Sequence, residues 1–500
     1  MTALAARMAL LVMALAAALP PAPASAAPLG ALPPTIRVNV AGLGTVSARI
    51  ASTGTIRVTG PDGAVFYRGS ATTTARLGVY RLGEERPRPP DADVRPRSRA
   101  EWIERRQWIL GDGMPLVVAS RPTVLVPFEL AAIVKPLVDP IGDPLIRSDR
   151  IVAPIHYEAE SGLLSYNGRI FRGRLELQLD DAGDMIVVNE VSTRDYLASV
   201  VGSEIPVNWH AEAQAAQAIA ARTYLFTHLG RRSAYDIEGD VRDQAYEGFG
   251  RETSATLRAV DRTKGIIATY RGRPIEALYS ANTGGVTEDS ENVWGNRIAY
   301  LRSVPSPWDE AANNSSWGKT SWEWKKELTP AQLGAFLRQR GINVGLPDRV
   351  ELRQVASSGR VLQAAVVGDR GTRTIGRDSS RYYFGLRSSL FTVEKVAGGD
   401  TEGVHYLDAA RIRTLEELGA ERVAIGYKIE RGEDRAIYSV EVNSYIYELP
   451  GRFVFRGRGF GHGIGMSQWG MQGMAMAGKS AEEILKHYYV GIELTDIGGD

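Results

Sequence analysis

Apolar and polar residues alternate along several short stretches of the chain. Ile36 and Val38 form one such run and Ile56 and Val58 form a second, both within residues 35–68. Alternation with a period of two puts every second side chain on one face of an extended segment. Glycine-rich breaks separate the runs, so the pattern predicts short antiparallel strands joined by turns.

A hairpin and a helix are predicted next along the chain. In residues 172–189, alternating leucines lead into Asp-Asp-Ala-Gly, and a branched apolar run returns. This pattern is typical of two antiparallel strands. Ser192 and Asp195 then form a capping box in front of an amphipathic run, and Pro206 must end that helix because proline cannot continue the backbone hydrogen bonds.

A longer helix is predicted from about His210 to Leu229, and it is rich in alanine. Alanine leaves little side-chain bulk, so such a helix approaches its neighbours closely on several sides and is expected to be central. A polar stripe that includes Arg222 follows one side of it. This stripe is either a solvated face or a face that lines a groove, and the pattern alone leaves both open.

The second half of the chain predicts further short elements, and no internal repeat is visible. They are a strand–turn–strand at 265–277, an irregular tryptophan-rich segment at 308–324, a helix near 330–340, strands at 350–355 and 361–367, a short helix at 408–419, and a capped helix from Ser480 to Tyr489. Together these patterns predict an α+β fold with mixed, mostly antiparallel strands, a central alanine-rich helix, and an N-terminal β-rich module.

The first residues have the features of an export signal. An uninterrupted apolar run from Met8 to Leu19 is followed by prolines and by Ala24-Ser25-Ala26, the small residues that signal peptidase needs. The run is shorter than the roughly twenty residues that span a bilayer as a helix. We therefore expect export to the periplasm, the cell envelope or the extracellular space, with a mature chain that starts near Ala27 and has no membrane span.

Composition excludes several classes of function. Lys+Arg 59 against Asp+Glu 58 gives a net charge of +1, which argues against broad electrostatic capture of nucleic acid. Cysteine is absent, so disulfides, thiol nucleophiles and thiolate zinc sites are excluded. The six histidines show no i, i+3 or i, i+4 pair and no HExxH, and no G-x-S-x-G is present. We expect neither a metal nor another cofactor.

Glycine recurs at every second position from Gly457 to Gly465. No register completes G-x-G-x-x-G, and no GK[ST] follows, so the segment is not a phosphate loop. In an extended chain this spacing bares one face of the backbone, which lets a flat ligand such as a sugar ring approach main-chain donors. A tightly packed buried strand or bulge explains the same pattern.

Glu204 is the strongest candidate for acid–base chemistry. It follows the end of the first predicted helix, lies among apolar residues and precedes the turn at Pro206. A carboxylic acid in apolar surroundings has its pKa raised, because desolvation penalises the charged form, and a general acid at neutral pH needs this. The ordinary alternative is a solvated surface residue at a helix end.

Three stretches, at 187–226, 274–309 and 455–491, together resemble the stage II sporulation protein D family, which includes amidase enhancers of the bacterial cell wall. The first matches the family's YL-x-x-V-V-x-x-E-x-P turn and its ARTY helix, the second has the paired glycines and VWG, and the third has the GHG run. All three occur in family order, and the resemblance covers roughly Ile151 to Gly491.

The resemblance implies a peptidoglycan lytic transglycosylase that acts on glycan strands freed of their stem peptides, with Glu204 as the catalytic acid. It also implies a groove that binds the substrate. By analogy the groove residues are Gln217, Arg222, Tyr224, Asp243, Gln244, Tyr246, Asn282, Gly284, Gly285, His462, Ser467 and Gln468. The alternative that the family offers is a binding module that grips glycan or a cell-wall amidase and stimulates that amidase without cutting.

The chain departs from the family pattern in two places. Some members hold a zinc ion through Cys and His, and this chain has no Cys, so that metal is not expected. The hydroxyl pair before the paired glycines is here Asn282-Thr283.

The expected organisation has five segments. They are a signal peptide at 1–26, a β-rich region at 27–150 with a Pro/Arg-rich linker near 84–106, a catalytic core at 151–320, an α+β accessory region at 321–450 with a candidate insertion at 397–448, and a glycine-rich segment with a C-terminal helix at 451–500.

Overall fold

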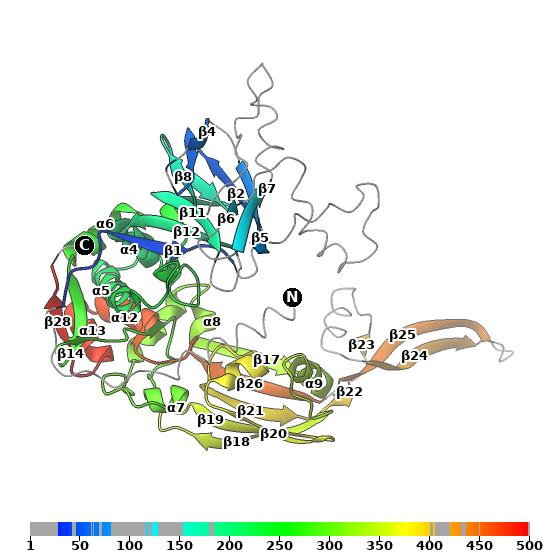
Figure 1. The fold of residues 1–500 in the computed structure, drawn as a ribbon. Helices are drawn as coiled ribbons and strands as arrows, with labels where there is room; N and C mark the ends of the chain where they lie inside the picture. The colour runs from blue at the N-terminus through cyan, green and yellow to red at the C-terminus, as the bar shows by residue number, and fades with distance from the viewer. Residues whose placement is uncertain are drawn as a thin grey trace, which may run out of the picture. The chain divides into compact units, whose positions relative to one another are not determined.

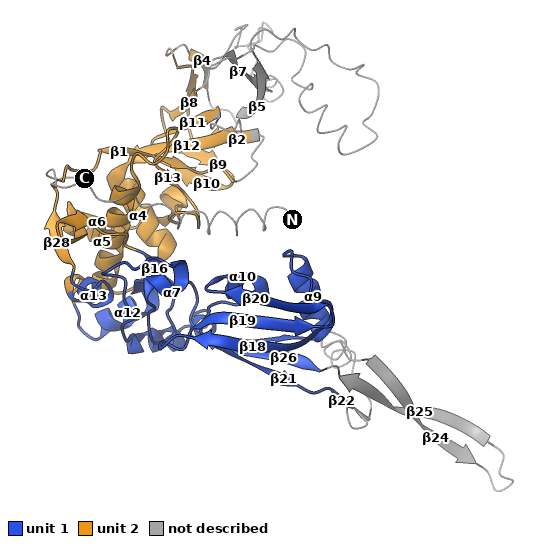
Figure 2. Cartoon of the chain, turned by 60° about the horizontal axis from the view of Figure 1, so that its bottom comes forward, with its two compact units in different colours: residues 1–22, 278–479, 483–491 blue, residues 23–277, 480–482, 492–500 orange. Residues whose placement is uncertain are grey.

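The computed structural model describes most of the chain (Figure 1). The described residues are 29–42, 47–61, 63, 65–69, 73–81, 117–118, 123–128, 154–179, 185–400, 404–405, 421–431, 437–449 and 451–498. They form two compact units, shown in different colours in Figure 2. Unit 1 contains the described residues within 278–479 and 483–491, and unit 2 contains the described residues within 29–277, 480–482 and 492–498.

The described residues of unit 2 form two larger sheets and one small sheet. The seven-stranded sheet has the order β13 (Ile237–Glu238), β1 (Thr35–Asn39), β12 (Met185–Ser192), β11 (Arg174–Leu179), β8 (Ile155–Ala159), β3 (Ile56–Thr59) and β4 (Val65–Gly69). The six-stranded sheet has the order β10 (Arg169–Phe171), β9 (Leu164–Tyr166), β2 (Ser47–Ser52), β5 (Thr73–Arg81), β7 (Thr123–Phe128) and β6 (Val117–Val118). The small sheet joins β15 (Arg273–Pro274), β14 (Ile266–Tyr270) and β28 (Glu493–Asp496).

The N-terminal strand β1 lies inside the seven-stranded sheet. It pairs antiparallel with β12 and parallel with β13. Ile36 and Val38 are fully buried, as the alternation predicted. The predicted hairpin is formed by β11 and β12, which pair antiparallel from Arg174 to Leu179. Strands from both sides of residue 150 thus build one layer, and the compact units divide the chain near residue 277.

Both predicted helices follow the hairpin. α4 (Thr193–Glu204) begins after Ser192, whose hydroxyl accepts the Asp195 N–H at 3.1 Å, and it ends before Pro206 as expected. α5 (Ala211–His228) is buried along most of its length, which confirms its central position. η1 (Gly248–Arg251) and α6 (Ser254–Arg262) follow α5 along the chain; neither was predicted.

In unit 1 the described ranges form short helices and four small sheets. Its helices are α7 (Ser290–Trp294), η2 (Pro307–Asn314), α8 (Lys319–Trp322), α9 (Pro330–Arg338), α10 (Ser379–Phe384) and α12 (Gln468–Met476), and α13 (Ala481–Tyr488) begins in unit 2 and continues into unit 1. The strand orders are β16 (Tyr279–Ser280)–β27 (Met466–Ser467); β17 (Glu323–Leu328)–β26 (Arg452–Arg458)–β21 (Phe391–Val396); β18 (Pro347–Val355)–β19 (Val361–Gly368)–β20 (Gly371–Gly376); and β22 (Gly399–Asp400)–β25 (Ile437–Leu449)–β23 (Val404–His405), with β24 (Glu421–Arg431) paired to β25.

One hydrophobic core joins two of these sheets. Phe453 and Phe455 of β26 pack with Phe391 of β21, Val366 of β19 and Leu337 of α9. Of these elements, α9 and β19 were predicted from the sequence, and β21 and β26 were not. The core fixes β26, which leads directly into the glycine-rich segment.

The α+β prediction is confirmed, since mixed helices and mostly antiparallel sheets fill the described residues. The segment 308–324, expected to be irregular, contains η2 and α8. The helix predicted at 408–419 lies outside the described residues. Within the described ranges, no helix combines the length and the apolar character that crossing a bilayer requires.

Candidate functional site

Glu204 is the last residue of α4. Hydrogen bonds join this end of the helix to the segment 245–248. The Ala245 N–H donates to the Glu204 Oε1 at 2.7 Å, and the Glu247 N–H donates to the Ser203 hydroxyl at 3.2 Å. One turn earlier, the Ser199 hydroxyl donates to the Gly248 carbonyl at 2.8 Å. The acid is half-buried, so its carboxylate is both oriented by backbone and partly accessible.

A glycine permits this close approach. A Cβ at Gly202 would lie 2.1 Å from the Arg251 carbonyl oxygen, far inside van der Waals contact. Only glycine therefore lets the last turn of α4 pack onto η1. Two residues of the V-V-G-S-E-I-P sequence thus have structural roles. The glycine permits the close packing, and the proline ends the helix.

The segment that holds Glu204 is itself fixed by buried side chains. The Gln244 Oε1 accepts the Tyr196 hydroxyl at 3.0 Å, and the Tyr246 hydroxyl donates to the Asn189 Oδ1 at 2.6 Å. Gln244 and Tyr246 are each 1% exposed. Burial raises the pKa of the Tyr196 and Tyr246 hydroxyls well above the usual value, so both remain hydrogen-bond donors.

Asp243 links the same segment to α5. Its Oδ1 accepts the Tyr224 hydroxyl at 3.2 Å, and its Oδ2 accepts the Glu238 N–H at 2.8 Å and pairs with Arg232 at 2.9 Å. Burial raises the pKa of the Asp243 carboxyl, while these donors oppose that rise. The Tyr224 ring stacks on His228 with centroids 3.8 Å apart.

The other two candidates on α5, Arg222 and Gln217, differ in their hydrogen bonding. Arg222 is fully buried and donates to the Val260 carbonyl and the Thr263 hydroxyl, both at 3.2 Å, so it ties α5 to the end of α6. Its stripe is therefore a packed face rather than a solvated one. Gln217 is also fully buried, but neither atom of its amide has a hydrogen-bond partner among the described residues. It shares a face of α5 with Tyr224, two turns away.

In unit 1 two of the candidate residues, Gly285 and Ser467, donate to a carboxylate that the sequence did not single out. Asp309, fully buried at the start of η2, accepts the Thr283 N–H at 3.1 Å, the Thr283 hydroxyl at 2.6 Å and the Gly285 N–H at 2.9 Å. It also accepts the hydroxyls of Ser306, at 3.0 Å, and of Ser467. Burial raises its pKa, and these hydrogen bonds oppose the rise.

This carboxylate fixes the paired glycines and the start of α12. Gly284 and Gly285 have φ of +77° and +100°, a conformation that L side chains rarely adopt. The Asn282 amide donates to the Asp309 carbonyl at 3.1 Å and accepts the Gly284 N–H at 2.8 Å. Ser467 is the N-cap of α12, and Gln468, 6% exposed, is its first residue.

The glycine-rich segment is not extended, so the expectation of a bare extended strip is wrong. Beyond β26, the glycines at 459, 461, 463 and 465 all have positive φ, between +69° and +120°. Glycine tolerates both extended and left-handed backbone, so a period of two in the sequence did not distinguish them. A Cβ at Gly463 would lie 2.3 Å from the buried Arg360 guanidinium, in agreement with the packed alternative.

His462 is held by this segment in one tautomer. The Ile464 N–H donates to Nδ1 at 3.0 Å, so Nε2 carries the proton and donates to the Tyr279 carbonyl at 3.1 Å. Burial, reinforced by the nearby Arg381 charge, lowers the pKa of His462 to about 4. The imidazole is neutral at ordinary pH and serves as a structural bridge.

We expect the free energy of unfolding to fall as the pH drops from 6.5 toward 4. In this range unfolded His462 binds a proton and the folded residue does not, which favours the unfolded chain. His462→Gln should flatten the slope by up to about 1.4 kcal/mol per pH unit. Urea unfolding at several pH values measures this. If the slope is unchanged in the variant, His462 binds protons in the folded chain as readily as in the unfolded chain, and the prediction is wrong.

The candidate residues therefore fall into two groups, one in each unit. Glu204, Gln217, Arg222, Tyr224, Asp243, Gln244 and Tyr246 lie in unit 2, and Asn282, Gly284, Gly285, His462, Ser467 and Gln468 lie in unit 1. Most of their side chains are engaged by the protein itself. Across the part of the chain that the structure describes, no three His, Asp or Glu side chains gather as a metal site.

The chain was compared with models of protein families and with individual known proteins, and both comparisons find similarity to stage II sporulation proteins. Residues 181–270 match the family model described as Stage II sporulation protein, and residues 301–407 match a domain of unknown function (DUF8618). An uncharacterized protein of Brachyspira hyodysenteriae is 28% identical over 345 residues, which are 68% of this chain and 76% of that protein.

Two relatives carry descriptive names. Stage II sporulation protein D of Bacillus amyloliquefaciens is 27% identical over 326 residues, 62% of this chain and 76% of the relative. Amidase enhancer of Bacillus subtilis is 27% identical over 318 residues, 60% of this chain and 40% of the relative.

The fold and these matches define the class as an α+β protein related to sporulation and amidase-enhancer proteins of the cell wall. The match over residues 181–270 and the named relatives support the SpoIID/LytB family for this chain.

Proposed function

We propose that this protein is a peptidoglycan lytic transglycosylase that cleaves peptide-free glycan strands and leaves 1,6-anhydro-muramyl ends. The observation that carries the proposal is Glu204, a half-buried carboxylate at the end of α4 that a backbone N–H orients at 2.7 Å. It lies within the segment that matches the family model. A fixed, partly accessible acid is what general acid–base catalysis requires.

The proposed reaction uses one carboxyl group twice. Glu204 protonates the glycosidic oxygen between N-acetylmuramic acid and N-acetylglucosamine, and the C1–O bond breaks. The resulting carboxylate then takes the proton from the muramyl 6-hydroxyl, whose oxygen bonds to C1 and closes the anhydro ring. No water attacks, so the second carboxylate of hydrolytic glycosidases is unnecessary.

The other nominated residues of unit 2 are proposed to position Glu204. Gln244 and Tyr246 anchor the segment whose Ala245 N–H meets the acid, and Asp243 with Tyr224 attaches that segment to α5. In unit 1, Asn282, Gly284, Gly285, Ser467, Gln468 and His462 are proposed to shape a glycan-binding surface through their fixed backbone. Because most of these residues are buried, we propose that they position the backbone of this surface rather than contact the glycan directly.

The test is mass spectrometry of peptide-free glycan strands incubated with the exported protein. Fragments that end in 1,6-anhydro-muramic acid support the proposal. Reducing-end fragments would indicate hydrolysis and an additional water-activating group. Strands that remain intact would contradict cleavage altogether.

The similarity to an amidase enhancer favours a second candidate. In that case the chain binds glycan or a cell-wall amidase and stimulates the amidase without cutting glycan. Release of stem peptides by a purified amidase, measured with and without this protein, separates the two. Stimulation without anhydro products supports the second candidate, and the Glu204→Gln variant should then stimulate as well as the wild type.

A substitution at Gln217 tests whether this face of α5 contributes to the proposed reaction. Its buried amide lacks partners, so Gln217→Leu removes an unsatisfied polar group and should raise the free energy of unfolding by about 1–2 kcal/mol. If the amide serves the glycan, cleavage falls at least tenfold in the same variant. Urea unfolding and product release measure both.

Gln214→Leu is the matched control on the same helix. The Gln214 amide donates to the Val207 and Trp209 carbonyls at 2.9 and 3.0 Å, so this variant should be less stable than the wild type. A Gln217→Leu variant that is more stable and fully active would leave Gln217 without a role in the reaction.

A further inference from the structure

The loop 238–247 carries the N–H that orients Glu204, and a buried carboxylate closes this loop. The Glu238 N–H, at the start of the loop, donates to the Asp243 Oδ2 at 2.8 Å. Two residues after Asp243, the Ala245 N–H donates to Glu204 at 2.7 Å. The position of the Asp243 carboxylate therefore helps to set the position of the N–H that meets the acid.

Arg232 pairs with this carboxylate from outside the loop. The Arg232 Nη2 lies 2.9 Å from the Asp243 Oδ2, and the Asp243 side chain is fully buried. Burial raises the pKa of the Asp243 carboxyl, and its hydrogen bonds and the Arg232 charge oppose that rise. A buried carboxylate is costly to ionise unless it is paired and hydrogen-bonded, so Arg232 stabilises the charged form.

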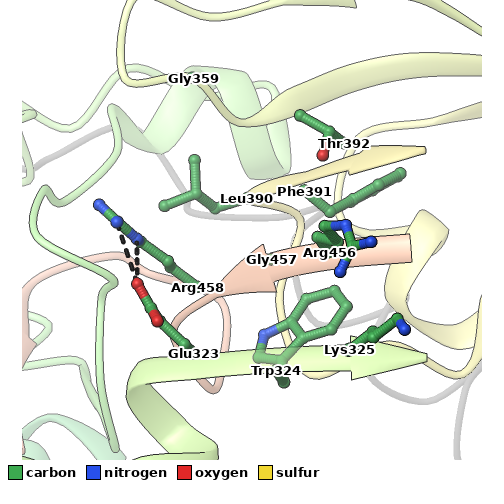
Figure 3. Close-up of a pocket in the computed structure, with 10 residues that line it drawn as sticks. All are labelled: Glu323, Trp324, Lys325, Gly359, Leu390, Phe391, Thr392, Arg456, Gly457 and Arg458. Atoms are coloured by element: carbon green, nitrogen blue, oxygen red, sulfur yellow. Dashed lines mark hydrogen bonds and ion pairs between the residues drawn. The ribbon is translucent and has the colours of Figure 1, made fainter. Parts of the chain in front are cut away.

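Burial distinguishes this ion pair from exposed pairs elsewhere in the protein. At a cavity of about 720 Å³ in unit 1, Arg458 pairs with Glu323 at 3.0 Å, and both side chains are more than half exposed (Figure 3). Exposed pairs of this kind contribute little to stability. In the pair formed by Asp243, the acid has no exposed surface and only 24% of the Arg232 side chain is exposed. Loss of Arg232 therefore leaves a buried carboxylate without its cation.

Contacts with neighbouring residues fix the Arg232 guanidinium. Its Nη1 donates to the Asp236 carbonyl at 3.3 Å, and its carbon lies 5.4 Å from the centroid of the Tyr235 ring. A guanidinium held in one orientation presents its donors to a carboxylate in a defined geometry. Arg232 thus constrains where Asp243 lies as well as neutralising its charge.

The histidine beside Asp243 does not supply a second cation. The His228 Nε2 lies 4.0 Å from the Asp243 Oδ1 and accepts the Arg231 Nη1 at 3.2 Å. Burial, reinforced by the Arg231 charge, lowers the pKa of His228 to about 4, so the ring is neutral at ordinary pH. Among the described residues, Arg232 is therefore the charged partner of Asp243.

The other titratable groups around Asp243 are uncharged or paired elsewhere. Burial raises the pKa of the Tyr224 and Tyr196 hydroxyls well above the usual value, so both are neutral. A substitution at Arg232 therefore acts mainly on the charge of Asp243. The remaining charged groups form pairs of their own, which are Glu238 and Asp240 with Arg242, each at 2.8 Å, and Glu276 with Arg231 at 2.7 Å.

We propose that Arg232 is a positioning residue of the reaction in which Glu204 is the acid. Arg232 keeps Asp243 ionised inside the loop, and Asp243 in turn holds the Ala245 N–H against the acid. This inference rests on the proposed function and adds to it a residue that acts on Glu204 only through Asp243. Small displacements of a group that orients a catalytic side chain lower the rate, because the reaction needs a fixed geometry.

The two limbs of the pH–rate profile then report on different groups. Glu204 enters the reaction protonated, so the rate falls on the alkaline side as Glu204 loses its proton. Protonation of Asp243 removes the charge that Arg232 pairs with, so the loop loosens and the rate falls on the acidic side. Without Arg232 the pKa of the buried Asp243 carboxyl rises further, and the acidic limb moves to higher pH by about one unit.

The test is the rate of anhydro-muramyl product release by the full exported chain as a function of pH. Arg232→Gln should lower kcat at neutral pH by about tenfold or more, leave KM nearly unchanged and shift the acidic limb. Arg232→Lys keeps the charge and should return the limb to its original position. Arg194→Gln is the matched control, because Arg194 pairs with Asp261 at the opposite end of α4 and both side chains are nearly half exposed.

A double-mutant cycle separates positioning from general destabilisation. Asp243→Asn has no charge for Arg232 to hold, so adding Arg232→Gln to it should lower kcat by less than about twofold further. This comparison also decides the matter if Arg232→Gln alone does not fold. Hydrogen exchange at the Ala245 amide does not depend on turnover, and it should accelerate by about tenfold or more in Arg232→Gln but not in Arg194→Gln.

Two results would overturn the proposal. One is that Arg232→Gln has the same pH profile and the same Ala245 exchange as Arg194→Gln. The other is that Arg232→Gln lowers kcat as much in the Asp243→Asn background as in the wild type. The proposed function fails separately, because a wild-type protein that releases no anhydro products contradicts the reaction itself, whereas an active wild type with an unaffected Arg232→Gln variant contradicts only the role of Arg232.

Discussion

Glu204→Gln should reduce the release of anhydro-muramyl products by about 10²- to 10⁴-fold while glycan binding persists. Glutamine keeps the shape of the side chain and can accept the Ala245 N–H through its amide oxygen, but it has no proton to transfer. Because the orienting hydrogen bond is retained, the free energy of unfolding should change little. The measurement is product release by mass spectrometry, with a glycan pull-down as the binding assay.

Glu247→Gln is the matched control for this variant. Glu247 lies in the same segment, is exposed, and pairs with Arg251 at 2.8 Å, so its substitution should leave cleavage unchanged. Full cleavage by Glu204→Gln would remove Glu204 from the mechanism. Glu288, Asp289 and Glu291 beside the paired glycines would then be tested, although the Glu288 side chain is fully buried and bonded to Ser358 and Asn292.

The part of the site that lies close in sequence was predictable. Ser192, Pro206 and the alanine run set the limits of α4 and α5 through capping, termination and packing, which are local effects. Glu204 was visible for the same reason, because it sits at the end of a helix that the sequence defines. The β11–β12 hairpin likewise follows from alternation around a short turn.

Other parts depend on contacts that sequence patterns do not show. The N–H that orients Glu204 is a backbone group 41 residues away, and any residue except proline supplies one. α12 was missed because two glycines in Gln468–Met476 lower helix propensity. In the structure Gly473 is needed, since a Cβ there would lie 2.5 Å from the Trp308 carbonyl oxygen.

Asp309 is the clearest case of a residue that only the fold reveals. Its donors come from Thr283, Gly285, Ser306 and Ser467, which are separated by up to 184 residues in the sequence. The one signal available was its position at the end of the second stretch that resembles the family, together with the hydroxyl residues Thr283 and Ser306 in that stretch and Ser467 in the third. Hydroxyls near a lone acid occur by chance in many sequences, so this signal is weak without coordinates.

Asp309→Ala should destabilise unit 1 by about 3–5 kcal/mol. The substitution leaves two backbone N–H groups and three hydroxyls without their acceptor in a fully buried place, and each buried unsatisfied donor costs about 1–3 kcal/mol before water or repacking compensates. Six of the nine tryptophans lie in unit 1, so urea unfolding followed by tryptophan fluorescence reports mainly on this unit.

Asp309→Asn and Asp348→Ala complete the experiment. Asparagine keeps the size and one acceptor oxygen, so its loss of stability should be intermediate. Asp348 is an exposed acid of the same unit that pairs with Arg349 and Lys395, and its removal should leave the unfolding midpoint nearly unchanged. The Asp309 variants should also lose protection from hydrogen exchange at the Thr283 and Gly285 amides. If Asp309→Ala unfolds at the same urea concentration as Asp348→Ala, the carboxylate does not hold the paired glycines and the N-cap of α12 together.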